Sequence, residues 1–196
     1  MRPNLLPLLF LLSFLQTKDK IVLKTHSGAT ISIIKNKIYF DNRPISGSVD
    51  DIIYKSKYNR IIEQDSSILL FLEIDGSPNL NRIEAFKVTS IKATKLVNCV
   101  YNDKIQGIGP APFTDMDHDG KLELGGFDLT EYYDSKDSMY YNPSKYYKIS
   151  DGTIKFDSAL TKKMDIKVNG IYLPHPLDKS GFCCAVIKIP KKKRGR

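Results

Sequence analysis

The sequence predicts an all-β fold built from antiparallel meanders. Three observations indicate it. The chain is rich in Val, Ile, Thr, Tyr and Phe, which strands favour. Short apolar runs alternate with turn sequences along most of its length. With 196 residues and 41% hydrophobic residues, it can bury the core of one domain. We expect a single β domain over residues 18–190, in propeller-blade-like units, with an open β-sandwich as the alternative.

The N-terminal part of this domain predicts a first strand and a hairpin. We expect a strand at residues 21–23 and a hairpin of residues 30–33 and 38–40, which turns at residues 35–37. Residues 41–48 contain Pro44 and Gly47 between polar residues, and this composition predicts a loop.

The central part carries the strongest β pattern. Its apolar runs predict strands at residues 52–54, 60–63, 67–74, 82–88 and 95–100. Residues 75–78, Asp-Gly-Ser-Pro, predict a turn. Short strands joined by tight turns form an antiparallel meander, and this one has the size of a propeller blade.

The C-terminal part is rich in tyrosine. Six of the 11 Tyr lie between residues 132 and 147 as three adjacent pairs, and strand alternation would turn one ring of each pair inward and one outward. The outward rings would either stack on sugars or pack at the sheet surface. Residues 146–149 and 153–156 predict a hairpin around Asp151-Gly152. We expect one helical turn within residues 157–164, a turn at Asn169-Gly170 and a last strand within residues 182–189.

The two ends differ from the domain in composition. Residues 1–17 combine Arg2 with an apolar run from Leu5 to Leu15, which predicts a secretory signal peptide and a secreted, periplasmic or cell-envelope location. The run is too short for a transmembrane helix, and an N-terminal strand or core helix is the alternative. Residues 191–196 hold five of the 30 basic residues and form a basic tail. No groove-reading motif accompanies this tail, so we expect no nucleic-acid partner.

The three cysteines are an odd number. Cys99 stands alone, and Cys183 and Cys184 are adjacent. One disulfide from Cys99 to either of the other two would leave one thiol free.

An acidic stretch, residues 113–126, carries the clearest chemical pattern. Asp115, Asp117 and Asp119 alternate with other residues, Gly120 follows, and Glu123 comes three positions later. Calcium takes six to eight oxygen ligands in a flexible shell. Three short carboxylates, a glycine that permits a sharp turn, and a longer carboxylate suit such a shell. We expect Ca²⁺ to bind Asp115, Asp117, Asp119 and Glu123 and the backbone carbonyl of Lys121. A solvated acidic turn is the alternative.

The flanks of this stretch favour strands over helices. An EF-hand loop that began at Asp115 would need Glu at its twelfth position, where Gly126 stands. Glycines and prolines in residues 107–112 disfavour an entering helix. Leu122 and Leu124 alternate with polar neighbours, as in a strand. An EF-hand-like sensor is therefore the less favoured alternative.

The stretch resembles the FG-GAP/VCBS type of calcium-binding repeat found in integrin-like propellers. The resemblance covers residues 107–126 as one copy. Its matching residues are Phe113, Asp115, Met116, Asp117, Asp119, Gly120, Glu123, Leu124, Gly125 and Gly126, after a small-residue lead-in at 107–112. It implies the same ligand set, with Lys121 contributing its carbonyl. The family usually has Asp at the ninth position, where this chain has Glu123, and Asp128 would be a weak substitute.

These observations predict an exported, calcium-binding β-protein with a non-enzymatic binding or structural role. Its partner would be a protein or a glycan. The sequence contains no Gly-x-Ser-x-Gly elbow, His-Glu-x-x-His motif or phosphate-binding glycine loop. The alternative is a secreted carbohydrate-active enzyme or glycan-binding protein in which calcium is structural.

Overall fold

The computed structural model describes residues 19–64, 66–77, 81–100, 112–127, 135–141, 143–174 and 184–189. These residues form fourteen strands and one helix. The all-β prediction is therefore confirmed. The expected signal peptide at 1–17 and basic tail at 191–196 lie outside the described residues. In the part of the chain that is described, no helix is long and apolar enough to cross a membrane.

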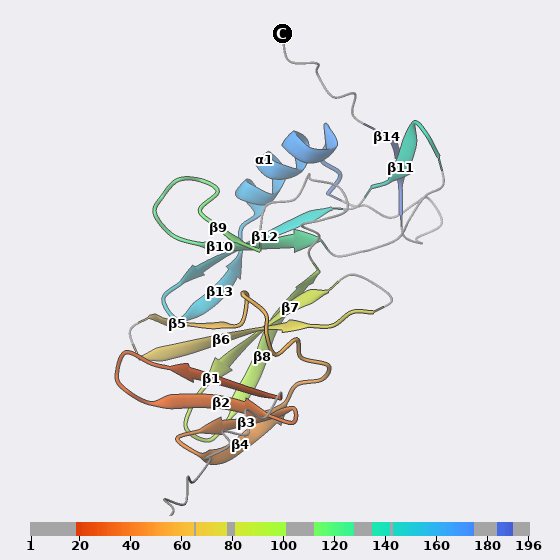
Figure 1. Ribbon diagram of the computed structural model, residues 1–196. Coiled ribbons are helices and arrows are strands. Elements are labelled where there is room, and N and C mark those ends of the chain that lie inside the picture. The colour runs from red at the N-terminus through yellow and green to blue at the C-terminus, as the bar shows by residue number, and fades with distance from the viewer. Residues whose placement is uncertain are drawn as a thin grey trace, which may run out of the picture.

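The first sheet is a four-stranded antiparallel meander (Figure 1). Its strands, adjacent in chain order, are β1 (Lys20–Lys24), β2 (Thr30–Ile34), β3 (Lys37–Phe40) and β4 (Arg43–Ser48). The two-residue turns Lys35-Asn36 and Asp41-Asn42 have positive φ at both positions, as type I′ hairpins require. The hairpin prediction for residues 30–40 is confirmed.

The loop predicted for residues 41–48 is wrong from Arg43 onward, where β4 begins. Pro44 removes a backbone donor, but β4 is the last strand in the order of this sheet, and an edge strand tolerates that loss. The register of β3 with β4 is also irregular between Lys37 and Tyr39, so the residues of β4 do not follow a simple alternating pattern that the sequence could reveal.

The second sheet contains eight strands, also antiparallel. Seven follow the order β13-β12-β10-β8-β7-β6-β5, and β9 pairs with β10. They are β5 (Arg60–Gln64), β6 (Ser67–Ile74), β7 (Arg82–Val88), β8 (Ala93–Val100), β9 (Phe113–Thr114), β10 (Glu123–Phe127), β12 (Ser144–Ser150) and β13 (Thr153–Phe156). The predicted meander over residues 60–100 and the hairpin at Asp151-Gly152 are confirmed.

The strand predicted at residues 52–54 is wrong, because only Ile52 makes an isolated bridge, to Ile74. The Asn59 side chain holds this segment instead. It donates to the Ile53 carbonyl (2.8 Å) and accepts from the backbone N–H of Glu73 (2.8 Å). These side-chain bonds add to the backbone bond from Ile53 N to the Glu73 carbonyl (2.9 Å), so the segment is held beside β6 without a regular strand ladder.

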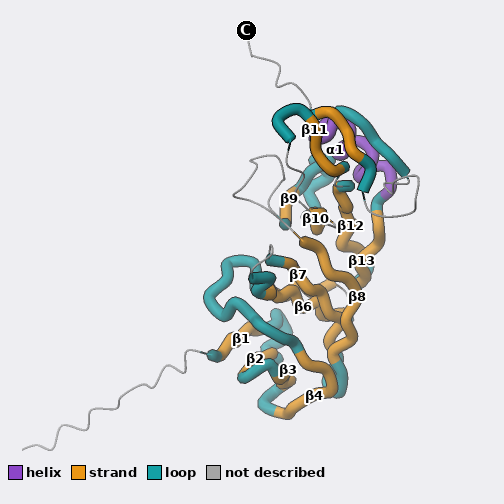
Figure 2. Tube along the Cα trace, turned by 90° about the vertical axis from the view of Figure 1, so that its right-hand side faces the viewer, coloured by secondary structure: helices purple, strands orange, loops and turns teal. Residues whose placement is uncertain are grey.

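The sheets are stacked as an open β-sandwich, not closed into a ring (Figure 2). Alternate residues of β6 pack into two different hydrophobic cores, one on each face of the strand. Strands β5–β8 therefore form the middle layer. Leu70 and Leu72 pack toward β1–β4, and Leu69 and Phe71 pack toward β9, β10 and β12. Among the described residues, the two halves of the eight-stranded sheet are joined where β8 pairs with β10 through Val100 and Phe127.

One helix covers the outer layer. Helix α1 (Ser158–Asn169) begins after the N-cap Asp157, which accepts from Leu160 N, and ends at Gly170 with φ of 72°. It is longer than the single turn predicted within residues 157–164. Asp165 of α1 is fully buried and accepts from Tyr141 Oη, from Ser144 N (2.9 Å) and from Asn169 Nδ2 (2.8 Å). A polar cluster therefore holds α1 against the sheet.

The remaining strands form a small antiparallel pair, β11 (Ser138–Tyr140) and β14 (Val186–Lys188). The predicted last strand is confirmed at Val186–Lys188, whereas residues 182 and 183 lie outside the described part. Cys184 is disulfide-bonded. The side chains of Cys99 and Cys183 are not described, so the expected pairing stays a prediction.

In both described tyrosine pairs one ring is buried and the other is partly buried, but the Tyr147 ring packs against the second core and does not turn outward as predicted. Tyr141 and Tyr146 are buried, and Tyr140 and Tyr147 are partly buried. The Tyr147 ring meets Phe156 edge-on, with centroids 5.7 Å apart. This contact favours surface packing over sugar stacking for the Tyr147 ring.

Candidate metal centre

The predicted loop lies in a hairpin between two strands. Strands β9 and β10 pair through Thr114 with Glu123 and Phe113 with Leu124, and residues 115–122 connect them. In the described residues 112–127 the flanks of the loop are strands, as the sequence predicts, and not the helices of an EF-hand.

The aspartates of the loop organise its backbone. The Asp115 carboxylate accepts from Asp119 N (3.1 Å) and Gly120 N (3.0 Å), and Asp119 Oδ1 accepts from Lys121 N (2.9 Å). His118 and Gly120 have φ of 64° and 84°. Glycine adopts such angles without a Cβ penalty, which explains Gly120 at the sharpest part of the turn.

Three carboxylates converge inside the loop. Oxygens of Asp115, Asp117 and Glu123 lie within 4.8 Å of one another. Glu123 is only 1% exposed, and its Oε2 accepts from Met116 N (2.7 Å). Burial, together with the nearby aspartates, raises the pKa of Glu123. The group thus places a buried carboxylate beside two partly buried ones.

The Asp119 carboxylate does not join this group. Asp119 turns one oxygen to Lys121 N, and its other oxygen lies 3.8 Å from Lys148 Nζ. The Lys121 side chain is exposed, as expected for a residue that offers only its carbonyl.

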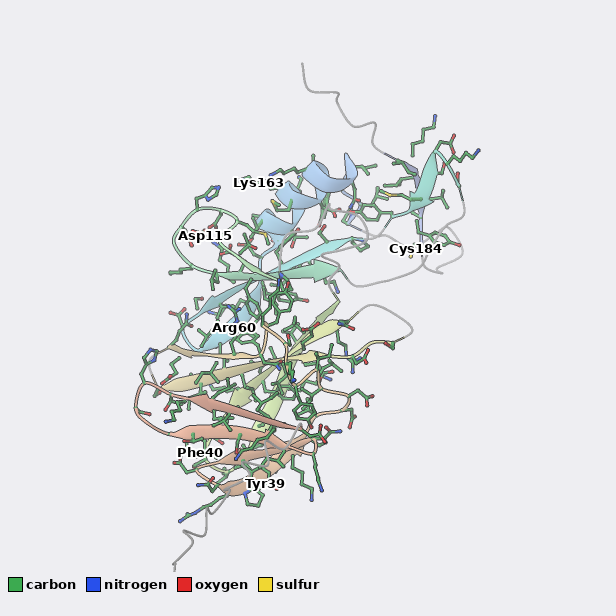
Figure 3. The ribbon with its side chains drawn as sticks, in the orientation of Figure 1. Tyr39, Phe40, Arg60, Asp115, Lys163 and Cys184 are labelled. Atoms are coloured by element: carbon green, nitrogen blue, oxygen red, sulfur yellow. The ribbon has the colours of Figure 1, made fainter. Side chains whose placement is uncertain are left out.

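Sequence reasoning missed the cation that faces the loop. Lys148 Nζ lies 2.8 Å from Asp117 Oδ2 and 3.6 Å from Asp157 Oδ2. Its hydrogen bond to Asp117 raises the pKa of Lys148 and lowers that of Asp117. Lys148 is brought there by register, because it is the β12 partner of Glu123 on β10. Lys163 of α1 adds a more distant positive charge, and Figure 3 shows it beside the loop that carries Asp115.

The glycine after Leu124 has a packing role. Gly125 pairs with Tyr146, and a Cβ on Gly125 would stand 2.5 Å from the Tyr146 ring and 2.9 Å from the Met116 methyl group. The missing side chain lets the buried ring of Tyr146 lie over β10 and lets Met116 turn inward beside the acidic loop. A larger residue at this position would force the Tyr146 ring and the Met116 side chain to shift.

The carboxylate set is suited to a hard cation. Asp and Glu oxygens are preferred ligands of Ca²⁺ and Mg²⁺, and the flexible geometry of Ca²⁺ tolerates three side-chain oxygens with carbonyls and waters. No protein-family model matches this chain, and no curated protein or solved structure shows significant similarity to it. The resemblance of residues 107–126 to the FG-GAP/VCBS repeat therefore stays a prediction.

Proposed function

We propose that the chain is an exported, non-enzymatic calcium-binding module in which one Ca²⁺ locks the β9–β10 loop against β12. Asp115, Asp117 and Glu123 supply side-chain oxygens, Asp119 joins them once the cation is bound, and Lys121 contributes its carbonyl. The observation that carries this proposal is the convergence of three carboxylates, one of which belongs to the buried Glu123.

The electrostatics of the loop support a cation. Buried carboxylates are costly unless they are paired or coordinate a metal. Glu123 is buried and receives one hydrogen bond, from Met116 N, and the three aspartates around it oppose its charge. A divalent cation would reverse this repulsion and make each carboxylate a stabilising ligand.

A second candidate is favoured by Lys148. Its ammonium already contacts the Asp117 carboxylate and faces those of Asp119 and Asp157. In this alternative the loop is a metal-free ion-pair cluster that fastens β10 to β12 and to the start of α1. The two candidates differ in whether the folded chain gains stability from calcium.

A thermal melt in EGTA and in millimolar calcium separates them. A ligand that binds only the folded state raises stability by mass action, by about 2.7 kcal/mol at 100 times its Kd. For a chain of this size that corresponds to a rise in Tm of about 5–10 °C. We expect this rise in the wild type and its loss in Asp115→Asn/Asp117→Asn.

The matched control is Asp19→Asn/Asp50→Asn, which removes two exposed carboxylates elsewhere. It should keep the full calcium response. Magnesium at the same concentration tests selectivity and should give a smaller shift. If calcium leaves the Tm of the wild type unchanged, while the loop variant melts lower than wild type in both conditions because Asp117 no longer pairs with Lys148, the metal-free ion-pair cluster is the correct description.

The proposed export rests on residues 1–17. A protein exposed to millimolar extracellular calcium fills even a weak site, so export and calcium binding support each other. N-terminal sequencing of the chain recovered from the medium or envelope fraction tests it. A mature chain that begins near Lys18 supports export, and an intact Met1 in the cytosolic fraction contradicts it.

A further inference from the structure

The outer face of the β1–β4 sheet combines exposed basic and apolar side chains. The inner face of this sheet packs into the core through Ile21, Ile31, Ile33 and Ile38. Strand register places the intervening residues together on the outer face. Across the sheet, Lys20 aligns with Ile34 and Lys37, and Val22 aligns with Ser32, Tyr39 and Pro44. Lys20, Val22 and Lys37 are exposed there, whereas the small Ser32 is buried among its neighbours.

Positive charge predominates on this face. Lys20, Lys24 and Lys37 project from it and are all exposed. Further exposed basic residues stand at its margins, namely Lys35, Arg43 and Lys92. Exposed acidic residues at its margins include Asp19, Asp41 and Asp50, and one Asp41 oxygen accepts from Thr30 N (2.7 Å). The face is therefore complementary to an anionic partner.

Exposed apolar side chains lie among these charges. Val22 is 49% exposed in the middle of β1, and Ile91 is 76% exposed, the highest value among the large hydrophobic residues described. Ile91 lies at the β4 margin of the face, because its carbonyl accepts from Ser46 N (3.0 Å) and Ser46 Oγ (3.2 Å). Tyr39 points away from the stacked sheets (Figure 3).

We propose that this face docks on an anionic lipid surface. Basic side chains near an anionic bilayer are attracted electrostatically. Shallowly inserted aliphatic residues add apolar burial, and tyrosine suits the interface between headgroups and acyl chains. Ile91, between β7 and β8, and Val22, in the middle of β1, are the residues that would insert. The lysines around them would contact lipid phosphates and carboxylates.

The composition favours lipid over other polyanions. Single-stranded nucleic acids and sugars are held largely by stacking on aromatic rings, and the described outer face presents one, Tyr39. A highly exposed isoleucine would add little to the binding of a nucleic acid or a sugar. Its transfer from water into a bilayer would be favourable. The acidic loop lies at the opposite end from this sheet in both views, so its carboxylates would stay away from the lipid surface (Figures 1 and 2).

The absence of tryptophan allows a site-specific test. Ile91→Trp in the full chain places a single reporter at the proposed insertion point. We expect a blue shift of its emission, and quenching by brominated acyl chains, with vesicles of 30% phosphatidylserine in phosphatidylcholine. Pure phosphatidylcholine should give neither. Ile166→Trp, at a 46% exposed position on α1, is the matched control and should not respond.

Charge removal gives the second measurement. Lys20→Gln/Lys24→Gln/Lys37→Gln in the Ile91→Trp background should weaken the vesicle response by about 100-fold, since each basic residue contributes about fivefold. Lys136→Gln/Lys162→Gln/Lys167→Gln removes the same charge from exposed positions at the other end and should leave the response unchanged.

Three results would overturn the proposal. The first is an equal response of the Ile91→Trp and Ile166→Trp variants, which would mean that another part of the chain binds the vesicle. The second is an unchanged affinity in the variant that lacks the lysines at positions 20, 24 and 37. The third is a soluble anionic polysaccharide that binds as tightly as the vesicles and depends on the same lysines, because the occupant would then be a polyanion and not a bilayer.

Discussion

At the residue scale, Lys148 sets the electrostatic balance of the acidic loop. Its ammonium is 2.8 Å from Asp117, 3.8 Å from Asp119 and 3.6 Å from Asp157. A single positive charge thus lies near three carboxylates, two from the loop and one from the start of α1, and partly neutralises them. It stabilises the metal-free loop and competes with any cation that the loop would bind.

Lys148→Met should therefore act in opposite directions with and without calcium. Methionine keeps the apolar stem and removes the charge. In EGTA we expect a Tm a few degrees below wild type, because the loop carboxylates then repel each other unopposed. We expect several-fold tighter calcium binding by isothermal titration calorimetry, because no internal cation competes.

Lys145→Met on the same strand is the control for this prediction, and it should change calcium binding little. Weaker calcium binding in Lys148→Met than in the wild type would show that Lys148 positions the ligands and does not compete with the ion.

Asp165 is a second residue whose charge affects stability. Burial raises its pKa, although hydrogen bonds from Ser144 N and Asn169 oppose the shift. The folded chain therefore holds this proton more tightly than the unfolded chain. The ionised carboxylate weakens the fold above its folded pKa, and this cost disappears as the pH falls below 3.8, the ordinary value.

Asp165→Asn should destabilise the fold by about 1–3 kcal/mol at pH 7, since one acceptor of the buried cluster is replaced by a donor. Urea unfolding between pH 4 and 7 measures it. The stability difference between wild type and variant should grow as the pH falls, because only the wild type loses the cost of ionisation. Asp50→Asn is the exposed control, and a difference independent of pH would contradict the assignment.

The sequence could predict the loop but not its counter-ion. Asp115, Asp117, Gly120 and Glu123 are close in the chain, so their spacing alone indicates a turn that gathers oxygens. Lys148 is 31 residues from Asp117, and it arrives through the register of β10 with β12. Register between strands joined by a long connection has no local signature, so no reading of residues 113–126 would find it.

At the element scale, the start of α1 serves two functions through Asp157. Its Oδ1 accepts from Leu160 N (2.8 Å) as a helix cap, and its Oδ2 faces Lys148. The cap therefore links the helix to the acidic loop.

Two substitutions separate these functions. Asp157→Ala removes both cap and charge and should cost about 1 kcal/mol by chemical denaturation. Asp157→Asn keeps the cap, because asparagine caps as well as aspartate, and should stay near wild type. Equal losses in the two variants would show that the charge facing Lys148, and not the cap, is what stabilises the helix start.

Helix α1 also shows why element boundaries are hard to predict. Its buried face includes Thr161, Asp165 and Asn169, so hydrophobic periodicity cannot reveal its full length. The cap Asp157 and the terminal Gly170 were the available signals. Strand β4 was missed because it contains Pro44 and Gly47, which are typical of loops. The Asp41-Asn42 turn before it was the available signal for a hairpin.

At the scale of the whole molecule, β6 joins two cores. Leu72 faces the β1–β4 sheet and Leu69 faces β10 and β12, and both are fully buried. The turn at Gly152 adds a further link, because Gln64 of β5 accepts from Gly152 N (3.1 Å) and donates to the Ile149 carbonyl (3.1 Å). Opposite ends of the eight-stranded sheet are thereby tied together, so the layers should unfold as one unit.

Leu72→Ala and Leu69→Ala test this with the same substitution on opposite faces of one strand. Each should cost about 2–5 kcal/mol, whereas Leu96→Ala, at a 42% exposed position, should change stability by less than about 0.5 kcal/mol. In a cooperative fold, either core variant lowers hydrogen-exchange protection in β2 and in β12 together. If Leu72→Ala exposes only β1–β4 while β10 and β12 stay protected, the middle layer does not couple the two cores, and the first sheet unfolds independently of the acidic loop.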